Sequence, residues 1–129
     1  MKKEIKEWFA KGKEDLLFAE AGFKESGLAS QACFLAHQAV EKFLKGYLLF
    51  KKGSFPKTHD LLFLLDLIVK EEKEFKKISE KVRILNGYYI PTRYPGGEIS
   101  VFSSKEARKA LKVAKEIIEF IERRLKNYK

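Results

Sequence analysis

Five polar residues within nine positions of one predicted helix form the densest group of chemically capable side chains in the sequence. His37, Glu41 and Lys45 follow one another at intervals of four residues, which places them on one helix face about 6 Å apart in rise. Gln38 and Lys42 lie beside them. This face is either exposed to solvent with one ordinary Glu–Lys pair, or it forms a polar site or an interface. A metal site is not expected, because the sequence has only two histidines and a lysine takes the third position.

A second group of candidate residues surrounds the other histidine, His59. Together with Lys57, it precedes an expected helix, where backbone N–H groups, a lysine and an imidazole suit an anion such as phosphate. Arg93 and Tyr94 occur in a segment rich in Gly and Pro, where they could clasp a phosphate or stack on a base. The alternatives are ordinary helix capping with a surface histidine, and tyrosines that only cover the end of a helical bundle.

Several common catalytic signatures are missing from the sequence. It has no phosphate-binding loop with Gly, Lys and Ser/Thr, no nucleophile elbow, and no carboxylate pair in a recognisable sugar-cleaving context. The single cysteine, Cys33, can form neither an internal disulfide nor a cysteine-based zinc site. We therefore expect neither a metal nor a cofactor.

The elements that must position these residues are predicted to be helical. Apolar residues recur at spacings of three, four and seven over about residues 3–25, which is typical of an amphipathic helix. Ser26-Gly27 breaks this pattern, and a second helix with a wide apolar stripe follows, ending near Lys52-Gly53. The first candidate group therefore lies on the second helix, and Lys57 and His59 follow soon after it.

The second half of the chain shows the same periodicity. Thr58 is expected to cap a third helix, with Asp60 at its second position. A further helix is expected through Phe75–Leu85, and a long irregular segment follows at Gly87–Phe102. Ser103 and Glu106 are spaced as a capping box that opens a long last helix. No alternating strand pattern occurs, so the predicted fold class is all-α, an up-and-down bundle of four to five helices in one domain over 1–129.

Composition limits the class of protein further. The chain has 129 residues, a net charge of +9, 45% hydrophobic and 35% charged residues, which argues against a disordered chain and a membrane protein. The longest apolar run, Leu61–Val69 interrupted by Asp66, is far shorter than the roughly 20 residues of a membrane span. The charged N-terminal sequence lacks the apolar core of a signal peptide, so a cytoplasmic location is expected. Few Asn, Gln, Cys and Met beside abundant Lys and Glu resemble the composition of thermophile proteins.

The positive charge is concentrated in two segments. Residues 26–57 carry five basic and one acidic side chain, and residues 103–129 carry nine and four, while the rest of the chain is neutral overall. Regional charge of this kind favours an anionic partner over a merely solubilising surface.

Three of these sequence segments together resemble the HEPN domain family. They are CFLAHQAVEKFLK at Cys33–Lys45, FPKTHDL at Phe55–Leu61, and RYP at Arg93–Pro95 before an Ala-rich last helix, with an early Asp15 in support. The resemblance spans nearly the whole chain. It implies a bundle of four to five helices, usually a homodimer, often encoded beside a minimal nucleotidyltransferase as a toxin–antitoxin-like pair. The family's name refers to a proposed nucleotide-binding role.

Some members of the family are metal-independent ribonucleases with an Arg followed four to six residues later by a His. Both histidines here precede the first arginine, Arg83, so this motif cannot occur. We therefore predict a binding module for a nucleotide, an RNA or a partner nucleotidyltransferase, with Lys57, His59, Arg93 and Tyr94 as the nucleotide- or anion-binding residues. The alternative is an RNA-cleaving toxin with an atypical site made of His59 and Arg93.

A homodimer is also expected from the sequence itself. The apolar faces of the predicted second and third helices are wider than a small bundle is expected to cover. No membrane partner is expected.

Overall fold

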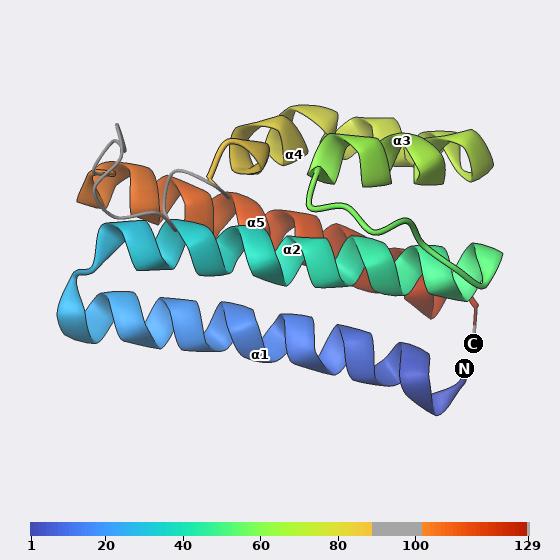
Figure 1. Ribbon diagram of the computed structural model, residues 1–129, viewed down its shortest axis with the longest axis horizontal. Coiled ribbons are helices and arrows are strands. Elements are labelled where there is room, and N and C mark those ends of the chain that lie inside the picture. Colours follow the sequence, from blue (N-terminus) through green and yellow to red (C-terminus); the bar gives the residue numbers. More distant parts are fainter. Residues whose placement is uncertain (89–101, 129) are drawn as a thin grey trace.

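Two long antiparallel helices, α1 (Lys3–Ser26) and α2 (Ala29–Lys52), form the first half of the chain (Figure 1). The structure is a computed structural model that describes residues 1–88 and 102–128. Gly27 and Gly53 end these helices with φ of 70° and 81°, a left-handed conformation that glycine adopts without a steric penalty. The helix boundaries predicted from the sequence are confirmed here, because strong local signals set them.

The second half of the chain is also helical. It contains α3 (Leu61–Glu71), a short 3₁₀ helix η1 (Lys73–Ile78), α4 (Ser79–Asn86) and α5 (Ser104–Lys126). The Ser103 hydroxyl accepts from the Glu106 N–H and the Glu106 carboxylate accepts from the Ser103 N–H, so the predicted capping box is present. The described residues contain no strand, and the predicted all-α bundle is confirmed.

Two local predictions were wrong. The cap of α3 is Asp60 rather than Thr58: the Asp60 carboxylate accepts from the Leu62 and Phe63 N–H groups, and the Thr58 hydroxyl accepts from the Asp60 N–H instead. The helix expected through Phe75–Leu85 is divided into η1 and α4. In a 3₁₀ helix, side chains three residues apart eclipse one another, and this geometry places Phe75 and Ile78 on the same buried side.

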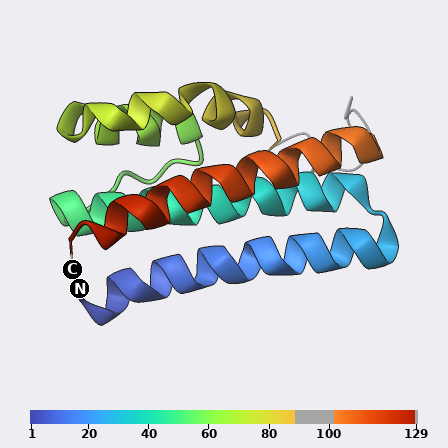
Figure 2. The same ribbon diagram turned by 180° about the vertical axis from the view of Figure 1, so that it is seen from behind.

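The helices stack in three layers, seen from both sides in Figures 1 and 2. α1 forms the first layer, α2 and α5 lie side by side in the second, and α3, η1 and α4 cover the second layer from the opposite side. The connection between α2 and α3, residues 53–60, runs back along α2 before α3 begins. This return path brings His59 over the middle of α2, the element that carries the first candidate group.

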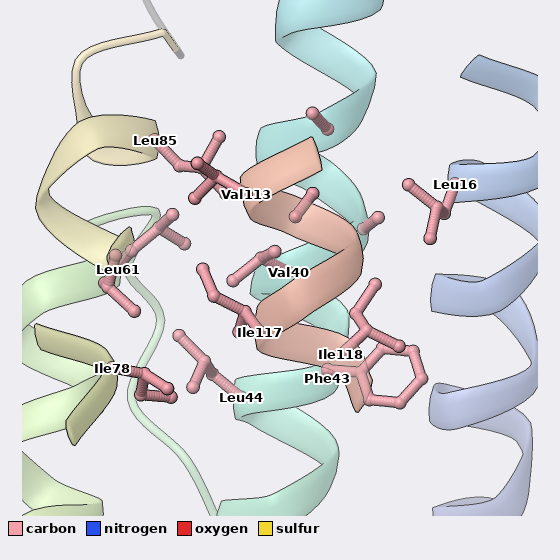
Figure 3. Packing of buried hydrophobic residues seen from close by; sticks show 14 of the residues in the cluster. Leu16, Val40, Phe43, Leu44, Leu61, Ile78, Leu85, Val113, Ile117 and Ile118 are labelled. Atoms are coloured by element: carbon pink, nitrogen blue, oxygen red, sulfur yellow. The ribbon is translucent and has the colours of Figure 1, made fainter. Parts of the chain in front are cut away.

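The core gathers around α2 and α5, where side chains from every helix meet (Figure 3). Val40, Phe43 and Leu44 on α2 are at most 1% exposed. α1 approaches closely because residue 12 is glycine: a Cβ there would lie 2.7 Å from Cδ1 of Phe43. The apolar stripe of α2 is thus covered within one chain, contrary to the reasoning that predicted a homodimer from it, and the dimer itself stays a prediction.

Candidate functional site

The polar face of α2 is buried, so the solvent-exposed interpretation of the sequence was wrong. His37, Glu41 and Lys45 are 0%, 5% and 7% exposed. Charged residues are rarely buried unless they are paired. The connection over residues 53–60 returns along α2 (Figure 1), and its residues Phe55 and His59 contact Lys45 and Glu41.

Glu41 is the centre of this buried cluster. One oxygen of its carboxylate lies 2.9 Å from Lys45 Nζ, and His59 Nδ1 lies 3.0 Å from both carboxylate oxygens. The Lys45 ammonium also lies 5.4 Å from the centre of the Phe55 ring, a cation–π contact. Phe55 and His59 both come from the α2–α3 connection, so the cluster fixes the path of that connection over α2. We call His37, Glu41, Lys45 and His59 the ionic cluster.

His37 completes the ionic cluster from inside the core. Its Nδ1 lies 3.9 Å from a Glu41 oxygen. Burial lowers the pKa of His37 from 6.5 to about 4, and it outweighs the nearby Glu41 carboxylate, which favours the charged form. His37 is therefore a neutral imidazole at pH 7, and it supplies no charge for anion binding.

The other two polar residues predicted on this helix belong to different surroundings. Lys42 forms an ion pair with Asp15 on α1 and links the first two layers. Gln38 is half-buried, and none of the contacts recorded within residues 1–88 and 102–128 joins it to the ionic cluster. The structure therefore brings three of the five predicted residues together.

The anion site expected at the start of α3 has lost its backbone donors to the protein itself. Asn86 Oδ1 accepts from the Leu61 N–H, and Asp60 Oδ1 accepts from the next two N–H groups. Lys57 is exposed nearby, whereas Arg93 and Tyr94 lie outside the described residues. Any anion at this place has to be held by side chains such as Lys57 and His59.

Five cations form a row on the surface of α5. The sequence had located them only as part of a positively charged segment. The members of the row are exposed and occur at spacings of three, one, three and three, which keeps them on one side of the helix: Lys105, Arg108, Lys109, Lys112 and Lys115. None of them forms an ion pair within the part of the chain that the structure describes. We call these five residues the α5 cation row. Their spacing in the sequence is the signal from which the row could have been predicted.

Helix stability does not account for the α5 cation row. Positive side chains near a helix N-terminus oppose the macrodipole, at a cost of about 0.3–1 kcal/mol each in the first turn. Lys105 lies in that first turn, one residue after the first residue of α5. A charge kept at an unfavourable position is consistent with a partner outside the helix.

Two further expectations can be compared with the described residues. They contain no group of three or more His, Cys, Asp or Glu side chains placed to hold a metal ion. No helix within the described ranges is both long and apolar enough to cross a membrane.

Burial raises the pKa of Cys33 from 9.0 to about 12, with a further contribution from Glu106, so this thiol is unreactive at neutral pH.

Fold and site together define a helical bundle with a buried ionic cluster and an exposed cationic helix. Residues 5–124 match the HEPN domain family, and the chain belongs to that family. The match covers α2, α3 and α4 in full, and α1 and α5 except for the first residues of α1 and the last of α5. The resemblance inferred from the sequence is thereby confirmed.

Two solved structures are similar over nearly their full length. The crystal structure of TT1696 from Thermus thermophilus is 31% identical, with a TM-score of 0.82 over 95% of this chain and 98% of that one. The structure of ST0689, described as an archaeal HEPN homologue, is 26% identical, with a TM-score of 0.75 over 96% and 98% of the two chains. None of the curated proteins compared with this sequence matches it.

Proposed function

We propose that this HEPN domain is an RNA-binding module that contacts the phosphate backbone through the α5 cation row. The observation that carries the proposal is this row of five exposed cations without an ion-pair partner in the described residues. From Lys105 to Lys115 the helix rises about 15 Å. That length corresponds to about four phosphates along one strand of a helical nucleic acid.

The chemistry of this face favours nucleic acid over the other classes of partner. Lysine is depleted in the cores of protein–protein interfaces, whereas four of the five cations here are lysines. The exposed residues of α5 between Ser104 and Lys115 include no apolar side chain that could enter a membrane. Binding without cleavage also agrees with the absence of the Arg-to-His ribonuclease motif.

Loss of two cations from the row is expected to weaken RNA binding about 10- to 30-fold at 0.1 M salt. The Lys109→Gln/Lys112→Gln variant removes two phosphate contacts. For a single strand, each lost contact reduces the slope of log K against log salt concentration by about 0.7. Fluorescence anisotropy with a labelled 20-nucleotide RNA measures both the affinity and this slope. Circular dichroism checks that the variant remains folded.

The matched control carries the same change of net charge on another layer. Lys70→Gln/Lys76→Gln alters exposed lysines on α3 and η1, and its salt slope is expected to equal that of the unaltered protein. If the control loses as much affinity as the α5 variant, only net charge attracts RNA and the assignment of the row is wrong. No measurable binding of the unaltered protein at 50 mM salt contradicts the proposal itself.

RNA cleavage is a second candidate function, and one observation favours it. The buried Glu41 carboxylate holds Nδ1 of His59, an arrangement that fixes the tautomer and orientation of an imidazole. More than half of the His59 side chain, 54%, is exposed. A general base held in this way could take a proton from a ribose 2′-hydroxyl.

Incubation of labelled RNA with the protein in a chelator tests this candidate. If His59 acts as the base, cleavage is expected to vanish in His59→Ala and to fall about 100-fold or more in Glu41→Gln, because a general base contributes about 10²- to 10⁴-fold. The Lys70→Gln/Lys76→Gln variant serves as the folded control. An unaltered protein that binds RNA and leaves it intact removes this candidate and retains the binding module.

The pairing with a nucleotidyltransferase implied by the family resemblance remains a proposal. It rests on the family alone, because neither the ionic cluster nor the α5 cation row points to such a partner. Co-purification of this chain with the product of a neighbouring gene, followed by identification of any bound nucleotide, would show whether the pair forms. A homodimer is tested separately by light scattering at micromolar concentration.

A further inference from the structure

An apolar groove lies where α1 ends and α2 begins. Its volume is about 320 Å³, and its walls include Phe18, Gly22, Phe23 and Leu35. Phe18 and Leu28, which both line the groove, are 69% and 60% exposed. Two of the six large hydrophobic residues that are exposed in the described chain therefore line this groove. Exposed apolar side chains that line a groove can mark an interaction site.

The charge around this groove has the opposite sign to the charge of the protein. Residues 14–31 contain four acidic side chains and one basic one, on a chain whose net charge is +9, and of the four only Asp15 is paired, with Lys42, among the described residues. Glu14, Phe18, Ala21 and Glu25 occur at spacings of four, three and four, so carboxylates flank the apolar residues along one face of α1. Neither Glu14 nor Glu25 has an ion-pair partner among the described residues. Glu25 lines the groove, and Glu14 lies one helical turn before Phe18, so the groove has an apolar floor and an acidic rim formed by these two carboxylates.

We infer that this groove, lined by α1 and the start of α2, is a docking site for a basic amphipathic helix of another protein. An amphipathic helix buries its apolar side chains in such a groove, and its flanking lysines or arginines meet the acidic rim. The inference is independent of RNA binding, because the α5 cation row attracts anions whereas this groove attracts a basic helix.

The acidic rim also disfavours the other occupants of an apolar groove. A second copy related by a two-fold axis would present its own Glu14 and Glu25 to the same acidic surface, and like charges repel. RNA and anionic lipids are repelled for the same reason. Charge complementarity therefore selects a basic partner.

Two model peptides test the charge and the apolar requirement together. One is a labelled 16-residue amphipathic helix of Leu and Lys, and the other has the same pattern with Glu in place of Lys. At 150 mM salt the Leu/Lys peptide is expected to bind at least tenfold more tightly than the Leu/Glu peptide. That preference runs against the net charge of the protein, so general electrostatics cannot produce it.

Variants locate the binding to the groove. Phe18→Ser removes an exposed apolar contact, and Gly22→Gln fills the groove at a position where an added Cβ meets no atom within 4 Å. Each is expected to weaken binding of the Leu/Lys peptide at least tenfold while leaving RNA affinity unchanged. Phe63→Ser is the matched control, because Phe63 is also exposed but lies on α3.

Three results would overturn the inference. They are equal binding of the two peptides, an equal loss of binding in Phe63→Ser, and a concentration-dependent dimer in analytical ultracentrifugation that Phe18→Ser abolishes. The last result would identify the groove as a contact between copies of this chain. Reversal of the peptide preference in Glu14→Lys/Glu25→Lys supports the proposed role of the rim.

Discussion

Replacement of Glu41 by alanine is expected to lower the free energy of unfolding by about 3–5 kcal/mol, because it leaves the Lys45 ammonium buried without its carboxylate. The Lys45 side chain is 9% exposed, so solvent compensates little for the lost partner. The change also releases His59 and with it the α2–α3 connection. Urea unfolding followed by circular dichroism measures the loss, which is a large fraction of the stability of a small domain.

Two further variants separate the buried pair from ion pairs in general. Glu80→Ala breaks the exposed pair with Arg83 on α4, and it is expected to cost less than about 1 kcal/mol. Glu41→Gln/Lys45→Met removes both buried charges at similar volume, and it is expected to recover much of the stability lost in Glu41→Ala. If Glu41→Ala costs no more than Glu80→Ala, the ionic cluster does not hold the connection in place.

Acid is expected to destabilise the protein through His37, beginning well above the pH range in which carboxylates titrate. In the folded state the pKa of His37 is lowered to about 4, whereas its ordinary value is 6.5. The unfolded chain therefore binds more protons between these two pH values. The stabilisation is fully present above pH 6.5 and is lost as the pH falls toward 4, by about 2 kcal/mol at pH 5 and about 3 kcal/mol at pH 4.

Urea unfolding at pH 7.5, 6.5, 5.5 and 4.5 measures this effect. His37→Gln keeps a neutral polar side chain, so its stability is expected to change much less over this interval. Burial raises the pKa of Glu72, but hydrogen bonds from Tyr128, Tyr47 and Arg124 outweigh it and lower the pKa from 4.5 to about 2. The Glu72 contribution is therefore lost only below about pH 4.5. If the free energy of unfolding of His37→Gln falls between pH 6.5 and 4.5 as steeply as that of the unaltered protein, the role of His37 is contradicted.

Local signals determined most of the secondary structure. Glycines that can adopt a left-handed conformation follow α1 and α2, and a complete capping box opens α5, so the boundaries of these helices were predictable. The cap of α3 was not, because Thr58 and Asp60 are both good capping residues and their order of preference depends on the path of the connection. The same limit applies to η1, since the spacing of Phe75 and Ile78 suits an α helix as well as a 3₁₀ helix.

The amino-acid sequence by itself determined the all-α fold, the HEPN family and the segments in which positive charge is concentrated, because periodicity, caps and composition are local properties. Only the tertiary structure decided that His37, Glu41 and Lys45 are buried, since their exposure depends on a connection that folds back along α2. It also decided that Phe18 and Leu28 flank one exposed groove while the apolar stripe of α2 is covered. Burial depends on which elements pack together, and the periodicity of a single helix cannot specify its neighbours.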